Sequence, residues 1–118
     1  MKILIKSGDI VDESVDILVS TANPWLTMSG GVNGELLHRG GESIQVELEA
    51  YLEKVGAKCV PQGTIIESSG GPFQYKCILH AVGIDAFYHS SIEVIETLLL
   101  ECIEIASSKG VGGGVKVA

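Results

Sequence analysis

Two kinds of apolar pattern alternate along the chain. Short, mostly apolar runs at 3–5, 15–20, 63–68 and 76–82 predict β-strands, and the run at 15–20 is typical of a strand covered on both faces. Longer segments with an apolar residue at every third or fourth position predict helices over 43–55 and from Ser90 to Lys109. A last run at 115–118 predicts the start of another strand. Strands and helices in this order indicate an α/β sandwich.

Capping residues set the expected ends of both helices. Ser43 is the expected N-cap of the first, Gly56 is its expected stop, and its buried face is expected to hold Ile44, Leu48, Tyr51, Leu52 and Val55. Ser90 and Glu93 form the expected capping box of the second. Its buried stripe is expected to hold Ile92, Ile95, Leu99, Cys102 and Ile103.

Composition narrows the class of protein. The 118 residues fit one domain, and 46% hydrophobic with 19% charged residues is ordinary for a soluble globular chain. The formal net charge of −7, with no Lys/Arg stripe, repels a nucleic-acid backbone. We therefore expect no nucleic-acid partner. A phosphorylated small molecule stays compatible, because main-chain N–H groups bind phosphate without basic side chains.

The sequence gives no sign of a metal site, a cofactor or a membrane partner. Its three cysteines are far apart and include no Cys-x-x-Cys pair, so neither a zinc site nor a disulfide framework is indicated. The apolar start is too short for a signal peptide, and no apolar run reaches the length of a membrane span. We expect a cytoplasmic protein without a cofactor.

A glycine-rich segment from Gly30 to Gly34 lies between the strand at 15–20 and a short helix that opens near Glu35. Glycines let the main chain approach a ligand, and a helix N-terminus offers unpaired N–H donors and the positive end of its dipole. The segment is therefore either a cradle for a pyrophosphate or a plain tight turn. It is neither a Walker loop nor a Gly-x-Gly-x-x-Gly fingerprint.

Polar residues near strand ends have two possible roles. The Asn23 amide could bind a sugar hydroxyl, or it could pin the turn before Pro24. The Asp9 carboxylate could accept from an exocyclic amine such as that of adenine, or it could cap a turn. We expect His38 and His80 to be structural.

These pieces, in this order, resemble the macro-domain family. Gly8-Asp9-Ile10 is similar to the family's opening Gly-Asp-Ile, and the segment ending in Ser20-Thr21-Ala22-Asn23 to its strand ending in Asn-Ala-Ala-Asn. Gly30-Gly31-Val32-Asn33-Gly34 resembles its first diphosphate loop. Later landmarks at Gly63-Thr64 and 78–83 extend the resemblance over the chain.

The resemblance implies a three-layer α/β/α sandwich with a mixed central sheet and a cleft for ADP-ribose. Asp9 would hold the adenine amino group, Asn23 would lie at the distal ribose, and the diphosphate would bind the main chain of Gly30, Gly31 and Val32. The other ligand-binding positions that it implies are Ile10, Ala22, Ser29 and Asn33.

The chain departs from the family pattern in three places. Ser20 replaces the first asparagine of Asn-Ala-Ala-Asn, and Asn33 replaces the aspartate of the hydrolytic members. Asn23 and Asn33 are the candidate catalytic positions, yet an amide cannot activate water as a carboxylate does. The chain ends at Ala118, before the family's last strands and helix. We therefore expect an incomplete fold whose open sheet edge favours homo-oligomers.

Three functions follow from this reading. The first is a module that binds ADP-ribose or an ADP-ribosyl group. The second is a hydrolase acting on O-acetyl-ADP-ribose or on ADP-ribosylated protein. The third is a structural or assembly fragment that binds no ligand.

Overall fold

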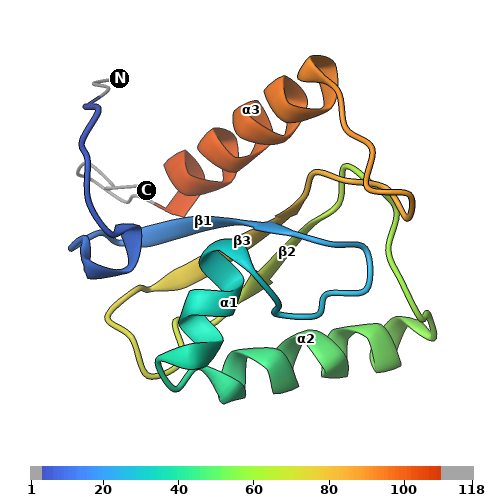
Figure 1. The fold of residues 1–118 in the computed structure, drawn as a ribbon, viewed down its shortest axis with the longest axis horizontal. Coiled ribbons are helices and arrows are strands. Elements are labelled where there is room, and N and C mark those ends of the chain that lie inside the picture. Colours follow the sequence, from blue (N-terminus) through green and yellow to red (C-terminus); the bar gives the residue numbers. More distant parts are fainter. Residues whose placement is uncertain (1–3, 110–118) are drawn as a thin grey trace.

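The computed structural model describes residues 4–109, and its centre is a mixed three-stranded sheet (Figure 1). The strands are β1 (Ile17–Ala22), β2 (Ile65–Ser68) and β3 (Cys77–Val82), in the order β1-β3-β2. β1 pairs with β3 in parallel and β2 pairs with β3 antiparallel. Every residue of the central strand β3 is buried, which explains its nearly continuous apolar sequence.

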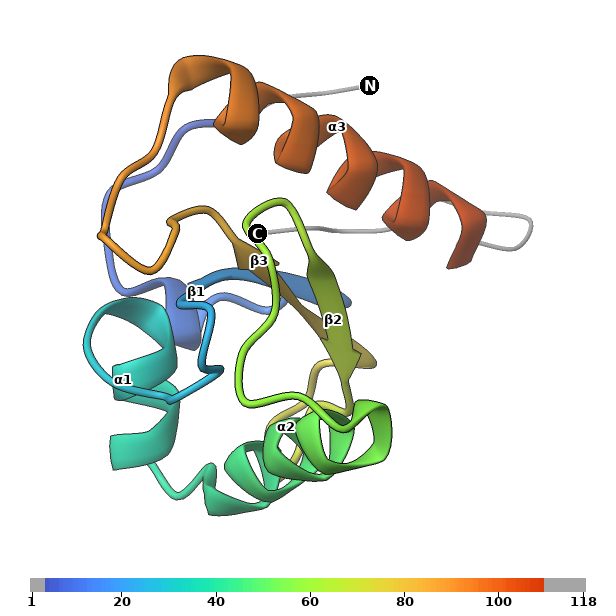
Figure 2. The same cartoon turned by 90° about the vertical axis from the view of Figure 1, so that its right-hand side faces the viewer.

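Helices cover both faces of the sheet. The helical elements are η1 (Ile10–Asp12), α1 (Gly31–His38), α2 (Glu42–Val55) and α3 (Ile92–Lys109). Figure 2 shows α3 on one side of the sheet and α1 with α2 on the other. The predicted three-layer α/β/α sandwich with a mixed sheet is confirmed for this part of the chain.

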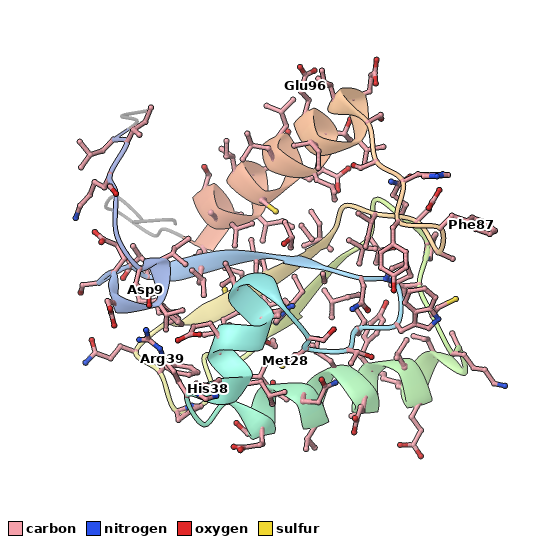
Figure 3. The ribbon with its side chains drawn as sticks, viewed as in Figure 1. Asp9, Met28, His38, Arg39, Phe87 and Glu96 are labelled. Atoms are coloured by element: carbon pink, nitrogen blue, oxygen red, sulfur yellow. The ribbon has the colours of Figure 1, made fainter. Side chains whose placement is uncertain are left out.

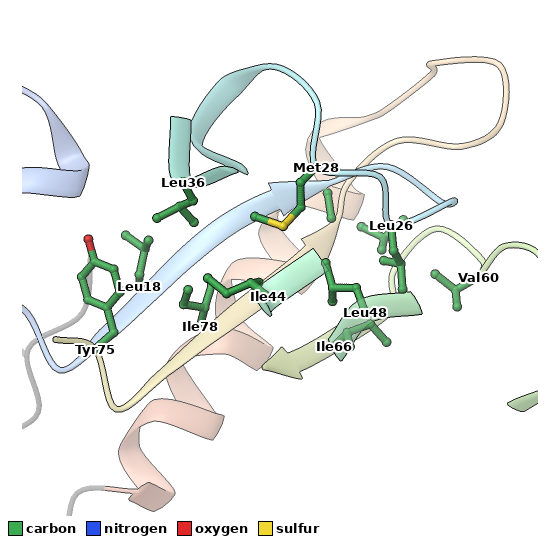
Figure 4. Packing of buried hydrophobic residues seen from close by; sticks show 12 residues of the cluster. Leu18, Leu26, Met28, Leu36, Ile44, Leu48, Val60, Ile66, Tyr75 and Ile78 are labelled. Atoms are coloured by element: carbon green, nitrogen blue, oxygen red, sulfur yellow. The ribbon is translucent and has the colours of Figure 1, made fainter. Parts of the chain in front are cut away.

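The larger core cluster lies between the sheet and the α1–α2 layer. Leu18 and Ile78 are neighbours in the parallel register, so they share a face of the sheet. Leu36 from α1 and Ile44 and Leu48 from α2 pack on that face (Figure 4). The alternate positions Cys77, Leu79 and Ala81 face α3 and form the second cluster.

The prediction for α2 is right in its body and wrong at its start. Gly56 ends the helix in the left-handed conformation, at φ +69°, as predicted. The helix begins at Glu42 with Gly41 as N-cap, so Ser43 is a helical residue and caps nothing. Of the expected buried face, Ile44 and Leu48 are buried, Tyr51 and Leu52 are partly buried, and Val55 is 50% exposed.

The cap and the buried face of α3 differ from the prediction. Ser91, not Ser90, caps the helix, since its Oγ accepts from the Val94 amide at 3.2 Å. Ser90 and Glu93 therefore form no capping box, because the cap lies one residue later. The buried stripe is Leu98, Cys102 and Ala106.

Most of the expected α3 stripe faces solvent. Ile92, Ile95 and Leu99 are exposed, and only Cys102 of the expected set is buried. The helix is apolar on more than one side, so periodicity could not select the face that meets β3. Because this apolar side is exposed, self-association of the chain is still expected. Light scattering at increasing protein concentration checks it.

The predicted strand at 3–5 is wrong where the structure describes it. Leu4 and Ile5 lie in no strand and are 74% and 93% exposed. An apolar run forms a strand only when a neighbour accepts its hydrogen bonds, and none of the described strands does so. Ile3, the run at 115–118 and the glycines at 112–114 lie outside the described residues. Among the helices in 4–109, none has the length and apolar character needed to cross a membrane.

Candidate functional site

The glycine-rich segment contains the start of α1, which begins at Gly31 and not near Glu35 as predicted, and it leaves main-chain donors without partners. Gly30 (φ +66°) is the N-cap and Gly31 (φ +56°) is the first helical residue. The Gly34 amide donates to the Gly30 carbonyl at 2.8 Å, and the Ser29 amide to the Thr27 carbonyl at 2.9 Å. Within the described residues, the amides of the first turn, 31–33, have no acceptor. This end of α1 can therefore receive an anion.

Asn23 follows β1 directly and pins the turn that carries the chain to the glycine loop. Its Oδ1 accepts from the Thr27 amide at 3.2 Å, and its Nδ2 donates to the Thr27 carbonyl at 2.9 Å. The turn-pinning role predicted as one alternative is therefore present. An amide group offers two hydrogens and two lone pairs, so one of each stays available to a ligand.

Gln45 of α2 clamps the same turn, and sequence reasoning missed it. Its Oε1 accepts from the Met28 amide at 2.7 Å, and its Nε2 donates to the Leu26 carbonyl at 3.0 Å. Leu26 has φ +56° and is 1% exposed, so burial and the clamp together hold a strained residue. A glutamine in a helix carries no sequence signal for such a contact.

The two side chains that depart from the family pattern meet each other. The Ser20 hydroxyl donates to Asn33 Oδ1 at 2.8 Å, and Asn33 Nδ2 donates to the Thr21 carbonyl at 3.2 Å. Ser20 and Asn33 are 1% and 4% exposed. The Asn33 side chain thus ties α1 to the end of β1. Ala22 lies beside this pair as the last residue of β1, and it too is buried.

Asp9 and Ile10 lie at the opposite end of α1 from the glycine loop. Asp9 caps η1 by accepting from the Val11 amide at 3.0 Å, and it also pairs with Arg39 (Figure 3). Arg39 follows the last residue of α1, and a helix of eight residues spans roughly 12 Å. The structure therefore gathers Ala22, Asn23 and residues 29–33 at one edge and places Asp9 and Ile10 apart from them.

Arg39 holds three carboxylates together, which sequence reasoning also missed. Its Nε donates to Glu35 at 2.8 Å and its Nη1 to Asp12 at 2.7 Å, in addition to the Asp9 pair. The hydrogen bonds to Glu35 and Asp12 raise the pKa of Arg39 above its usual range. The positive charge of the Arg39 guanidinium offsets the negative charge of these carboxylates at the negative end of the α1 dipole.

His80 lies inside the core, as expected of a structural residue. Its Nε2 is 2.8 Å from Ser68 Oγ, and its Nδ1 is buried without a partner. Burial lowers the pKa of His80 to about 4, so the ring is neutral at pH 7. His38 is exposed. Across residues 4–109, no three His, Cys, Asp or Glu side chains come together as metal ligands do.

Comparison with known proteins decides the family. The macro domain model matches residues 19–113. The chain belongs to the macro domain family. It is 35% identical to a macro domain-containing protein of Listeria monocytogenes over 70% of this chain and 46% of that protein. It is 32% identical to one of Caldanaerobacter subterraneus over 93% of this chain and 63% of that protein. The chain thus spans about half to two-thirds of these relatives.

Solved macrodomains share the fold. The Oceanobacillus iheyensis macrodomain with ADP superposes with a TM-score of 0.75 at 24% identity, over 86% of this chain and 55% of that one. A glycine-to-valine mutant of the same macrodomain, solved with ADPR, gives a TM-score of 0.74 at 23% identity. It covers 86% of this chain and 56% of that one.

Proposed function

We propose that this macro domain binds ADP-ribose or an ADP-ribosyl group, with the diphosphate on the main-chain amides at the start of α1. The observation that carries the proposal is the unpaired first turn at 31–33 behind two glycines of positive φ. Backbone donors at a helix N-terminus bind phosphate without a basic side chain, which suits a chain of net charge −7.

The spacing of three residues supports the same placement. Solved variants of the Oceanobacillus iheyensis macrodomain change an asparagine, a glycine seven positions later and an aspartate three positions after that. Asn23, Gly30 and Asn33 have this spacing here. In this proposal Asn23 lies at the distal ribose, to which its remaining amide hydrogen and lone pair are offered.

Asp9 is proposed to hold the adenine amino group. A carboxylate has about four lone-pair sites, and the Val11 amide and Arg39 use two of them. The adenine would then lie beside the carboxyl end of α1, with the diphosphate at its amino end.

Calorimetric titration of the chain with ADP-ribose tests the proposal. We expect saturable binding to one site, and clearly weaker binding of ribose 5-phosphate, which lacks the diphosphate and the adenine. Binding no tighter than millimolar would leave the ligand-free structural fragment as the remaining function.

Hydrolysis is the second candidate, and Asn33 separates it from binding. The Asn33 amide is buried and donates to the Thr21 carbonyl, so it offers no base to a water molecule. We expect no turnover of O-acetyl-ADP-ribose by the native chain. Asn33→Asp keeps the acceptor for Ser20 and introduces a carboxylate, so a gain in turnover is expected. Turnover by the native chain that equals or exceeds that of the variant would favour the hydrolase.

A further inference from the structure

The loop after β3 holds two exposed aromatic side chains in a conformation that its own hydrogen bonds stabilise. Tyr88 has φ +62°, which is unfavourable for an aromatic residue. Asp85 Oδ1 accepts from the amides of Phe87 at 2.8 Å and His89 at 2.9 Å, and the Asp85 carbonyl accepts from the Tyr88 amide at 3.0 Å. Gln62 Nε2 donates to the His89 carbonyl at 2.9 Å. The strain is therefore supported from several sides.

The two rings face solvent despite this support. Phe87 and Tyr88 are 78% and 73% exposed. Figure 3 shows Phe87 projecting away from the ribbon. These rings contribute little to the core of residues 4–109, so their faces are accessible to a partner.

The loop lies at the same edge of the sheet as the proposed nucleotide site. β1 and β3 are adjacent and parallel, so their carboxyl ends meet there. The rings of Trp25 and Tyr88 contact each other, with centroids 6.2 Å apart. Trp25 is 38% exposed and belongs to the turn between Asn23 and the glycine loop. The aromatic residues therefore flank the end of the site assigned to the distal ribose.

A shallow depression continues from this loop at the start of α3. Its volume is about 410 Å³, and its lining consists of Ser90, Ser91, Ile92, Ile95 and Glu96. An apolar wall with a carboxylate suits a long basic side chain, whose methylene groups cover the isoleucines while the charged end reaches the glutamate.

The charge of the surrounding chain favours the same kind of partner. Residues 77–108 contain no Lys or Arg, and their five acidic residues are Asp85, Glu93, Glu96, Glu101 and Glu104. Exposed aromatic rings attract cations through their faces, and the planar guanidinium of arginine stacks on them. An acidic or nucleic-acid partner would be repelled here.

We infer that Trp25, Phe87, Tyr88 and the depression ending at Glu96 dock an Arg- or Lys-bearing protein segment to which the ADP-ribosyl group is attached. We call this set of residues the aromatic-acidic surface. The inference rests on the proposed nucleotide site, because the bound nucleotide brings the attached segment to this edge. It assigns the ligand to a class, namely ADP-ribosylated basic protein segments.

Titrations with three ligands test the assignment: free ADP-ribose, an ADP-ribosylated peptide with arginines flanking the modified residue, and the same peptide with alanines there. We expect the arginine peptide to bind about fivefold more tightly than the other two, from one or two exposed cation–π contacts and an ion pair. The preference should shrink in 0.5 M salt.

Variants locate the effect. Tyr88→Gly removes the ring and fits the positive φ, and Phe87→Ala changes a highly exposed side chain, so neither needs to disturb the fold. Glu96→Gln removes the carboxylate, and Glu49→Gln on the exposed side of α2 is its matched control. We expect the first three to reduce the preference by about twofold to threefold each, without changing the affinity for free ADP-ribose, and Glu49→Gln to leave both unchanged.

The outcomes separate the two proposals. Equal affinities for the three ligands, with ADP-ribose bound, would overturn the docking inference and leave the nucleotide site intact. A preference that survives all three variants would also overturn it. Dimerisation of the chain that Tyr88→Gly abolishes would assign the surface to a second copy instead. Absence of binding to every ligand would overturn the nucleotide site and this inference together.

Discussion

The two ends of α1 meet solvent with different chemistry. At the amino end, Gly30 and Gly31 expose main-chain N–H groups, and no charged side chain lies in 17–34. At the carboxyl end, Arg39 gathers the carboxylates of Asp9, Asp12 and Glu35. The positions of the main-chain N–H groups at the amino end depend only on the backbone conformation. The charges at the carboxyl end belong to side chains, which a substitution can replace. A ligand site built on the amino end should therefore tolerate substitutions at its other residues, but few substitutions of its glycines.

The groups behind the two ends also differ in burial. Ser20 and Asn33 tie the amino end to the sheet from inside the core, and His80 lies on the neighbouring strand in direct register with Ser20. The ion pairs of Arg39 lie at the surface. Removing the partner of a buried polar group lowers the free energy of unfolding more than breaking an exposed ion pair does. Changes to the buried groups should therefore lower the free energy of unfolding more than changes to the surface ion pairs.

The largest expected effect is a loss of stability in mild acid caused by His80. Its pKa in the folded chain, about 4, lies below the ordinary 6.5, so the unfolded chain takes up the proton first as the pH falls. The contribution to the free energy of unfolding is complete above pH 6.5 and is lost between pH 6.5 and about 4. Between pH 7 and pH 5 we expect a loss of about 2 kcal/mol, measured by urea denaturation.

His80→Leu supplies the control for that measurement. The variant should lose this part of the pH dependence, while His38→Gln, which changes an exposed histidine, should retain it. The same slope in His80→Leu as in the native chain would show that other groups cause it.

The next effect concerns the glycine conformations. Gly31→Val places a β-branched residue at φ +56°, and no atom lies within 4 Å of the added Cβ, so the cost is conformational. A penalty of about 1–2 kcal/mol should move the first turn and weaken ADP-ribose binding by about tenfold, as measured by calorimetry.

Gly56 provides the matched test away from the proposed ligand contacts. Gly56→Val meets φ +69° and equally open space at the end of α2, so it should lower stability by a similar amount and leave the affinity unchanged. Equal weakening of ADP-ribose binding by both variants would contradict the proposed diphosphate site at the amino end of α1.

A smaller effect is expected from Ser20→Ala. Removing the hydroxyl leaves Asn33 Oδ1 buried without its donor, which should cost about 1 kcal/mol of unfolding free energy. Ser29→Ala, at an exposed position, should change little. Equal losses in the two variants would mean that the buried hydrogen bond contributes nothing.

The smallest effect is expected from Arg39→Gln. Its partners are all at least partly exposed, so solvent and salt screen the interaction. We expect a shift of the urea midpoint that is barely measurable at low salt and absent in 1 M NaCl. A large shift that persists in high salt would place Arg39 among the groups that hold the fold.

Local signals predicted the parts of the fold that depend on local chemistry. The stop of α2 at Gly56 needed only a glycine after an amphipathic run. The glycine-rich segment was placed correctly after a strand and at a helix start, but the helix expected to open near Glu35 begins at Gly31, inside that segment. The turn-pinning role of Asn23 was one of two predicted alternatives, because an asparagine before a proline is a local turn signal. The layered architecture followed from the order of these elements.

Contacts between distant segments were not predictable in the same way. Ser20 and Asn33 were recognised separately as departures from the family, but nothing in the sequence shows that they bond to each other. Arg39 meets Asp9 across 30 positions, and Gln45 reaches back to the turn at 26–28. The buried face of α3 was predicted wrongly because several of its sides are apolar and only the packing on β3 selects one.

The burial of two of the three cysteines gives the folded chain a single reactive thiol. Cys77 and Cys102 lie in the core cluster under α3, and burial raises the pKa of both, so the nucleophilic thiolate is scarce there. Cys59 is exposed in the connection after α2. A maleimide dye should therefore attach at one position in the native state and at three after denaturation. The number of dyes per chain, read by mass spectrometry, would report how much of a sample is folded without any ligand being known.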